Sequence, residues 1–282
     1  MQEQLVGRVV EQQLLESYLQ SGRSEFIAVY GRRRVGKTFL IRQVIGDKAS
    51  FTISGMENVT TNDQLLNFKI ALNRYGAIDQ ECTNWLEAFD LLITYLESLP
   101  NGNKIVFIDE MPWMDTPSSR FVSSLEHFWN DWASARNDIK LIVCGSATSW
   151  MMDNLINNHG GLHNRVTHQL LLEPFTLGEC REYFTRYGFG YSEREIVDCY
   201  MVLGGIPYYF SLMNSADSVA QNIDRLFFSP TGELRYEMTN LFRSLFRHSE
   251  SYVSIVEALS KKSKGLTRSE LLEVTKLNNN AR

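Results

Sequence analysis

The sequence predicts an α/β fold in which a parallel sheet is covered by helices on both faces. Several short segments are apolar throughout and end at turn residues, which is typical of strands buried on both sides. These segments alternate with longer stretches that carry apolar residues at helical spacing. The strand signals stop after about Pro174. We therefore expect a three-layer α/β domain followed by a mainly helical region.

Length and composition limit the class of protein. A chain of 282 residues fits two or three small domains, and 44% hydrophobic with 22% charged residues is ordinary for a globular protein. The net charge of −5 argues against a protein that coats nucleic acid without specificity. The four cysteines lie far apart, which argues against a zinc site of paired cysteines and a disulfide framework. With no signal-like N-terminus and no apolar run long enough to cross a bilayer, we expect a cytoplasmic protein that does not enter membranes.

Each element follows from its local pattern. The first part of the chain predicts, in order, a helix over 11–20, a strand over 25–30, a helix over 37–45, a strand over 50–53, helices over 62–75 and 84–99, a strand over 104–109, a helix over 120–135 and a strand over 139–145. The strand over 104–109 has the clearest signal, because its apolar run is unbroken and turn residues bound it. Between 176 and 245 we expect several helices, interrupted at 188–190 and 204–207.

Residues 31–38 match the phosphate-binding pattern G-x-x-x-x-G-K-[ST] without deviation. Its glycines let consecutive backbone N–H groups point at phosphate oxygens, beside the N-terminus of a helix. Lys37 would reach the β- and γ-phosphates, and the Thr38 hydroxyl would hold Mg²⁺. For the three arginines at 32–34, a phosphate contact and a solvated basic loop are both open. The candidate nucleotide contacts here are Gly31, Arg34, Val35, Gly36, Lys37, Thr38 and Phe39.

An acidic pair follows the strand over 104–109, about 70 residues after the phosphate loop. Asp109, at the end of the strand, would be the second group that holds Mg²⁺. Glu110 is placed to orient or deprotonate the water that attacks the γ-phosphate. Together with the phosphate loop, this pair predicts an ATP site with a catalytic glutamate.

With these motifs the chain resembles the AAA+/STAND group of P-loop ATPases, of the type called ATPase domain predominantly from Archaea and related to origin-recognition ATPases. The resemblance covers roughly residues 5–282, and its first further mark is Leu5-Val-Gly-Arg-x-x-Glu11. In such proteins this segment lies beside the adenine. The resemblance therefore adds Val6, Gly7 and Arg8 to the candidate nucleotide contacts.

Two later segments resemble the family's sensor strand and the segment that carries its arginine finger. Leu141–Ser149 resembles its sensor strand, which makes Ser146 a candidate sensor near the γ-phosphate; a plain strand-end turn is the alternative. Gly160-Gly-Leu-His-Asn-Arg165 resembles a G-x-x-x-x-R segment. Arg165 would then be an arginine finger, in cis or toward a neighbouring subunit of a homo-oligomer, or else an ordinary loop residue.

Two C-terminal segments complete the resemblance. Gly204-Gly-Ile-Pro207 resembles the G-x-P motif of STAND lids, whose proline packs near adenine, which makes Pro207 a candidate contact. Helices over 251–260 and 266–274, the second with Thr267 as N-cap and Glu270 at N3, resemble the start of a winged-helix domain. The expected domains are 1–174 (ATPase core), 175–244 (helical lid) and 245–282 (N-terminal part of a winged-helix domain). Because a recognition helix and wing would follow, we expect this chain to be a piece of a longer protein.

Charge is unevenly distributed along the chain. Residues 242–282 hold eight Lys or Arg and four Glu. A basic segment on an acidic body favours DNA as a candidate partner, although a winged helix used only for protein packing has the same composition.

The favoured function is Mg²⁺-dependent hydrolysis of ATP to ADP that drives a conformational switch, with a regulatory role. The alternative is a nucleotide-loaded DNA-binding or scaffolding module with little turnover. Glu110 favours hydrolysis, because a protein that only binds nucleotide needs no acid to position water.

Overall fold

The computed structural model describes residues 5–76, 80–157, 161–162, 164–245 and 249–277. The chain forms two compact units, Met1–Ser211 and Leu212–Arg282. The domain limits expected from the sequence, at 174/175 and 244/245, stay predictions.

The first unit is built around a five-stranded parallel sheet with the strand order β2-β3-β4-β1-β5. The strands are β1 (Glu25–Tyr30), β2 (Ala49–Ser54), β3 (Lys104–Asp109), β4 (Ile139–Gly145) and β5 (His168–Leu171). At the carboxyl end of β1, Tyr30 is in register with Gly145 of β4 and Leu171 of β5. The phosphate loop, the acidic pair and Ser146 each follow one of these strands. Parallel pairing therefore brings them to the same edge of the sheet, where α/β proteins bind ligands.

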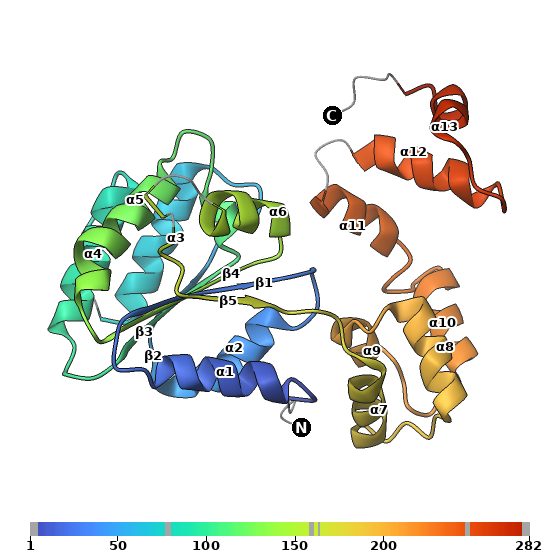
Figure 1. Ribbon diagram of the computed structural model, residues 1–282, viewed down its shortest axis with the longest axis horizontal. Helices are drawn as coiled ribbons and strands as arrows, with labels where there is room; N and C mark the ends of the chain where they lie inside the picture. Colours follow the sequence, from blue (N-terminus) through green and yellow to red (C-terminus); the bar gives the residue numbers. More distant parts are fainter. Residues whose placement is uncertain (1–4, 77–79, 158–160, 163, 246–248, 278–282) are drawn as a thin grey trace. The chain divides into compact units, whose positions relative to one another are not determined.

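Helices cover both faces of the sheet (Figure 1). On one side lie α1 (Val9–Leu19) and α2 (Lys37–Ile45); on the other lie α3 (Thr61–Arg74), α4 (Trp85–Ser98) and α5 (Phe121–His127). The second face carries the larger aromatic core, in which Trp85, Phe89 and Phe121 pack with their rings within 6.1 Å of one another. The predicted three-layer α/β fold is confirmed.

The structure adds detail that the sequence pattern did not predict. The helix expected over 120–135 is regular only in α5; a π-helical turn over Phe128–Trp132 and a 3₁₀ turn over Ala133–Ala135 follow it. A short helix α6 (Thr148–Met151) and a π-helical turn over Met152–Ile156 come after β4.

A small helical cluster follows β5 within the first unit. It consists of α7 (Leu177–Arg186), α8 (Glu193–Leu203) and α9 (Pro207–Ser211). Thr176 and Glu179 form a capping box at the start of α7, and Ser192 with Glu195 forms another at α8. The cluster has an aromatic core in which Phe184 lies 4.8 Å from Phe210, ring centroid to ring centroid.

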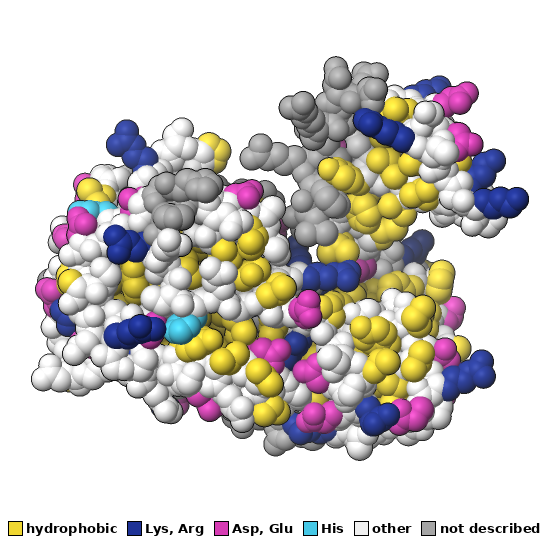
Figure 2. Space-filling view, in the orientation of Figure 1, with side chains coloured by type: hydrophobic (Ala, Val, Ile, Leu, Met, Phe, Trp, Pro, Cys, Tyr) yellow, Lys and Arg dark blue, Asp and Glu magenta, His cyan; other side chains and the backbone are white. Residues whose placement is uncertain are grey.

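The second unit contains α10 (Val219–Ile223), a π-helical turn over Asp224–Phe228, α11 (Glu237–Leu245), α12 (Ser249–Ser260) and α13 (Arg268–Thr275). The two helices that resemble the start of a winged helix are present, and Thr267 and Glu270 form the expected capping box. The winged-helix assignment itself stays a prediction. Figure 2 shows hydrophobic side chains gathered on this unit, where Tyr252, Val256 and Leu259 of α12 are exposed.

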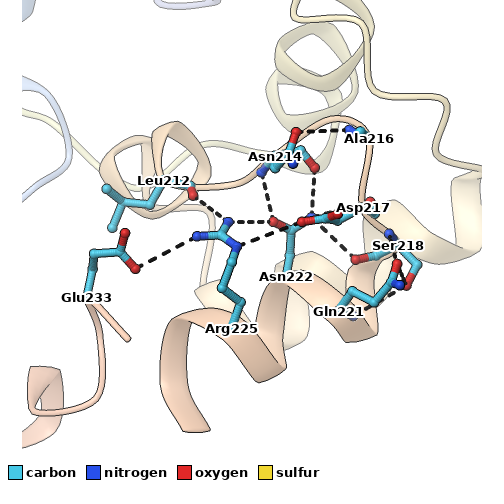
Figure 3. A network of polar contacts seen from close by, with 9 residues as sticks. All are labelled: Leu212, Asn214, Ala216, Asp217, Ser218, Gln221, Asn222, Arg225 and Glu233. Atoms are coloured by element: carbon cyan, nitrogen blue, oxygen red, sulfur yellow. Dashed lines mark hydrogen bonds and ion pairs between the residues drawn. The ribbon is translucent and has the colours of Figure 1, made fainter. Parts of the chain in front are cut away.

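A buried asparagine organises the start of the second unit (Figure 3). The Asn222 side chain is fully buried; its Oδ1 accepts the Asn214 N–H (2.8 Å), and its Nδ2 donates to the Asn214 carbonyl (2.9 Å). Arg225 donates to both Asn222 Oδ1 and the Leu212 carbonyl at 2.9 Å. The loop before α10 is thus fixed to that helix by satisfied buried polar groups. Among the described residues, no helix is long and apolar enough to cross a bilayer.

Candidate nucleotide site

The phosphate loop has the backbone shape that its glycines allow. Gly31 (φ 143°) and Gly36 (φ 91°) occupy backbone regions that side chains disfavour. A Cβ at Gly31 would collide with the carbonyl oxygen of Leu172, so the close approach of the chain after β5 also requires glycine. Arg34 adopts the left-handed conformation without being glycine (φ 72°). The loop leads directly into α2, whose first residue is Lys37.

Lys37 is folded back onto the phosphate loop. Its side chain is buried, and Nζ donates to the carbonyls of Gly31 (2.9 Å) and Arg32 (3.0 Å). Burial lowers the pKa of Lys37, while the nearby Cys144, Glu110 and Asp109 act in the opposite direction. A phosphate would supply the opposite charge that a buried ammonium needs.

A hydroxyl and a carboxylate meet where α2 begins and β3 ends. Thr38 Oγ1 donates to Asp109 Oδ1 at 3.1 Å, and Asp109 Oδ1 also accepts the Glu110 N–H at 3.0 Å. Mg²⁺ prefers hydroxyl, carboxylate and water oxygens, so this donor set fits the metal that the sequence predicted. Thr38 and Asp109 remain the predicted metal ligands, and the structure places their oxygens in contact.

Glu110, the predicted catalytic base, is hydrogen-bonded by Ser146, the candidate sensor. Both the backbone N–H (3.1 Å) and Oγ (2.9 Å) of Ser146 donate to Glu110 Oε2. Because Glu110 follows β3 and Ser146 follows β4, the pairing of these strands creates the contact. The sequence placed both residues near the γ-phosphate but did not predict that they bind each other.

The N-terminal segment contacts the phosphate loop through Arg8. The Arg8 side chain is buried, its Nη2 donates to the carbonyls of Val35 (3.4 Å) and Glu173 (2.5 Å), and its guanidinium lies 4.8 Å from the Phe175 ring centroid. The Arg8 N–H donates to Glu179 Oε1 at 3.0 Å. Arg8 therefore ties the phosphate loop to the chain around β5 and α7. Whether it also contacts nucleotide stays a prediction.

A cavity of about 430 Å³ lies over the phosphate loop. Its lining includes these residues that the sequence selected: Val6, Arg8, Arg34, Val35, Gly36, Lys37, Thr38, Phe39, Glu110 and Pro207. It also includes a set that the sequence did not select: Leu5, Phe175, Tyr183, Tyr187, Tyr208 and Ser211. The cavity thus combines a phosphate-binding loop with an apolar, aromatic wall suited to a base.

The sequence contained a signal for part of that wall. Tyr183 is on α7 and Tyr187, four residues later, is the C-cap of that helix, so both lie on the same side of it, with their ring centroids 4.5 Å apart. Such spacing equally describes a core face, which is why the sequence alone did not distinguish a nucleotide wall from packing.

Five predicted site residues do not line the cavity: Gly7, Gly31, Asp109, Ser146 and Arg165. Gly31, Asp109 and Ser146 each contact a lining residue: the Gly31 carbonyl accepts from Lys37, Asp109 from Thr38, and Ser146 donates to Glu110. Gly7 packs against Glu179, since a Cβ there would come within 2.6 Å of that side chain.

Arg165 lies apart from the cavity. It is exposed in the loop before β5, where its N–H donates to the Leu162 carbonyl at 3.0 Å. Gly160 and His163 of the same motif lie outside the described residues. The finger role stays a prediction.

Comparison with known proteins agrees with this geometry. Residues 5–213 match the family model described as ATPase domain predominantly from Archaea. The uncharacterised protein MJECL04 of Methanocaldococcus jannaschii is 28% identical over 262 residues, which cover 90% of this chain and 54% of that protein. The chain therefore spans about half the length of this curated relative.

Solved structures share the fold. The Walker-type ATPase PABY2304 of Pyrococcus abyssi superposes with a TM-score of 0.66 at 19% identity, over 98% of this chain and 90% of that one. The STAND protein with a tetratricopeptide repeat sensor from Pyrococcus horikoshii has a TM-score of 0.51 at 13% identity, over 99% and 38%. Cdc6p of Pyrobaculum aerophilum has a TM-score of 0.51 at 15% identity, over 97% and 80%.

Proposed function

Because the chain belongs to the family of ATPase domains found predominantly in Archaea, we propose that it binds ATP with Mg²⁺ and hydrolyses the γ-phosphate bond. One observation carries the proposal: the phosphate loop, the Thr38–Asp109 pair and Glu110 meet at one end of the sheet, beside an aromatic cavity. Such a cavity can take a base and a triphosphate together.

Each group has a distinct role in this proposal. The N–H groups of the phosphate loop and the Lys37 ammonium bind the phosphates, and Thr38 and Asp109 hold Mg²⁺, which neutralises phosphate charge when bound. Glu110 accepts a proton from the attacking water, and Ser146 orients the Glu110 carboxylate. The base packs in the wall that includes Tyr183, Tyr187 and Pro207.

Hydrolysis would act as a switch through the helices after β5. Pro207, Tyr208 and Ser211 of α9 line the same cavity as Lys37 and Thr38, so the presence or absence of nucleotide changes what α9 contacts. A ligand shifts a conformational equilibrium only if it binds the two conformations with different affinity. Contacts that nucleotide makes with α9 in one conformation and not in the other provide that difference. We propose a STAND-type regulatory switch on this basis.

A second candidate function is a nucleotide-loaded DNA-binding or scaffolding module with little turnover. The Ser146–Glu110 contact favours it if the carboxylate stays bound to Ser146 when ATP is present, because Glu110 Oε2 is then not available to align water. Steady-state hydrolysis decides between the two: turnover well below one ATP per hour at saturating ATP supports the module. DNA binding is tested separately, by anisotropy with labelled duplex at two salt concentrations.

The phosphate loop is tested with Lys37→Ala. We expect the variant to lose ATP binding in calorimetry, because Lys37 supplies the main side-chain charge against the triphosphate. Lys48→Ala is the matched control, since Lys48 is exposed on the turn after α2. Equal ATP affinity in wild type and the Lys37 variant would disprove the site.

The hydrolytic step is tested with Glu110→Gln. This change keeps the shape and the hydrogen bond from Ser146 but removes the base, so ATP binding should persist while kcat falls on the order of 10²-fold. A parallel loss of binding and turnover would instead assign Glu110 a structural role.

A further inference from the structure

Arg33 and Arg34 of the phosphate loop have different surroundings. Arg33 is half exposed and approaches Glu57 at 4.0 Å. The Arg34 guanidinium lies 4.4 Å from the ring centroid of Tyr208 and 5.8 Å from that of Tyr209. The arginine that the sequence could not distinguish from its neighbours therefore has a specific aromatic partner, on α9.

We propose that Arg34 and Tyr208 form a latch that holds α9 against the phosphate loop and thereby sets how long a nucleotide stays bound. The proposal rests on the proposed function and deepens it by naming a regulatory contact of the same site. Arg34 is then a positioning residue rather than a phosphate ligand.

The contact geometry suits this role. A guanidinium within about 6 Å of an aromatic centroid is attracted by the negative face of the ring. Arg34 stands in the left-handed region at φ 72°, between the two glycines of the loop, so the turn sets the direction of its Cα–Cβ bond. The latch thus joins a backbone shaped for phosphates to a helix that contributes to the cavity wall.

The chain from Gly205 to Phe210, which enters and includes most of α9, is held by further contacts. Ile206 and Phe210 are fully buried, and the Gly205 carbonyl accepts the Phe175 N–H at 2.7 Å. The Tyr208 side chain is 42% exposed. Its ring contacts Arg34 of the phosphate loop and the neighbouring Tyr209, so the contact with Arg34 is the one that joins it to the loop.

The latch keeps the cavity wall in place before nucleotide arrives. Arg34, Pro207, Tyr208 and Ser211 all line the cavity over the phosphate loop. A wall that is already in its bound position costs less to order on binding, which appears as tighter binding and slower release. Loss of either partner should therefore loosen the wall and accelerate nucleotide dissociation.

A double-mutant cycle tests the latch. Arg34→Gln, Tyr208→Leu and the double variant are compared for the dissociation rate of a fluorescent ADP and for the Kd of ADP and ATP. We expect each single change to accelerate release about threefold to tenfold, in the range of one cation–π contact. The double variant should release no faster than either single one, because both changes break the same contact.

Conservative changes serve as controls. Tyr208→Phe keeps the ring and should stay within about twofold of wild type. Arg42→Gln removes the same charge from an exposed position of α2, outside the phosphate loop, and should leave the release of ADP unchanged.

Other outcomes would overturn the latch. Independent, multiplicative effects of the two substitutions would mean that Arg34 and Tyr208 act separately. If Arg34→Gln weakened ATP far more than ADP while Tyr208→Leu changed nothing, Arg34 would be a phosphate ligand. If wild type bound neither nucleotide, the proposed function would fail; normal binding without coupling would overturn the latch alone.

Discussion

At the scale of single residues, the site is most informative where two predicted residues bind each other. Ser146 gives both of its donors to one oxygen of Glu110, so its principal contact is with the base. A serine at this position can therefore act on hydrolysis without touching phosphate. A hydrogen bond to a charged group contributes about 1.5–3 kcal/mol, enough to affect the position of the carboxylate.

Ser146→Ala separates these roles. The alanine keeps the backbone N–H but removes Oγ, so we expect kcat to fall about tenfold while the Kd of ATP stays within about twofold. Turnover assays and calorimetry on the same preparation provide the two numbers, and Ser146→Thr, which keeps a hydroxyl, is the control. A loss of ATP affinity that is absent for ADP would make Ser146 a γ-phosphate sensor instead.

The sequence can identify site residues when they belong to a motif of residues close together in the chain. Gly36, Lys37 and Thr38 are consecutive, so their spacing alone encodes a phosphate loop. Tyr183 and Tyr208 come from different helices, and only the tertiary fold brings them to one cavity. A pattern of helical spacing cannot distinguish such residues from core, because both occupy an apolar face.

At the scale of elements, the sequence predicted the three central strands and the edge strand β2, but not the other edge strand, β5. β1, β3 and β4 are buried along nearly their whole length, which requires continuous apolar runs. β5 pairs only with β1 and alternates between exposed and buried residues over four positions. Its residues give no strand signal in the sequence.

The pairing of β1 with β5 includes an ion pair at its start. Glu25 of β1 is buried, accepts a hydrogen bond from Arg23 at 2.8 Å and approaches His168 of β5 at 3.2 Å. Burial acts to raise the pKa of Glu25, but hydrogen bonds from Arg23, Thr167 and Ser21 and the charge of His168 outweigh it and lower the pKa to about 2.

This lowered pKa predicts a pH dependence of stability. Because the folded pKa lies below the unfolded one, the contribution of Glu25 is fully present above about pH 4.5 and is lost as the pH falls toward 2. We expect Glu25→Gln to lower the free energy of unfolding at pH 7 by about 2–3 kcal/mol, and to flatten its decline between pH 5 and 3.

Urea unfolding at pH 7, 5, 4 and 3 measures this effect. Glu182→Gln is the matched control, since Glu182 pairs with Arg186 at 2.7 Å on the surface, where ion pairs contribute little. If the variant and wild type lost stability in parallel from pH 5 to 3, the carboxylate of Glu25 would not be responsible.

At the scale of the whole molecule, the cavity and all of its lining residues belong to the first unit. The sequence did not predict the division at Ser211/Leu212. A compact unit is defined by contacts between residues that lie far apart in the chain, and local sequence patterns do not reveal such contacts. Since one unit holds the phosphate loop, the predicted metal ligands and the predicted base, the group most readily supplied from outside is a cation for the transition state.

Arg165 is the candidate for that cation, and its exposure before β5 permits a contact with a second copy of the chain. A guanidinium from a neighbour would neutralise charge that develops on the transferred phosphoryl group. We expect Arg165→Ala to bind ATP normally but to hydrolyse it on the order of 10²-fold more slowly. In wild type, activity per subunit should rise with protein concentration as subunits associate.

Mixing two inactive variants distinguishes action in trans from action in cis. Arg165→Ala retains Glu110, and Glu110→Gln retains Arg165, so a mixed assembly contains complete sites in which the base and the arginine come from different subunits. Turnover measured across mixing ratios should therefore rise above that of either variant, with a maximum near equal amounts. Arg194→Ala, which changes an exposed arginine of α8, is the control and should have wild-type activity by itself. Full activity of a strictly monomeric wild type would exclude the trans finger, and loss of turnover without complementation would place the action of Arg165 in cis.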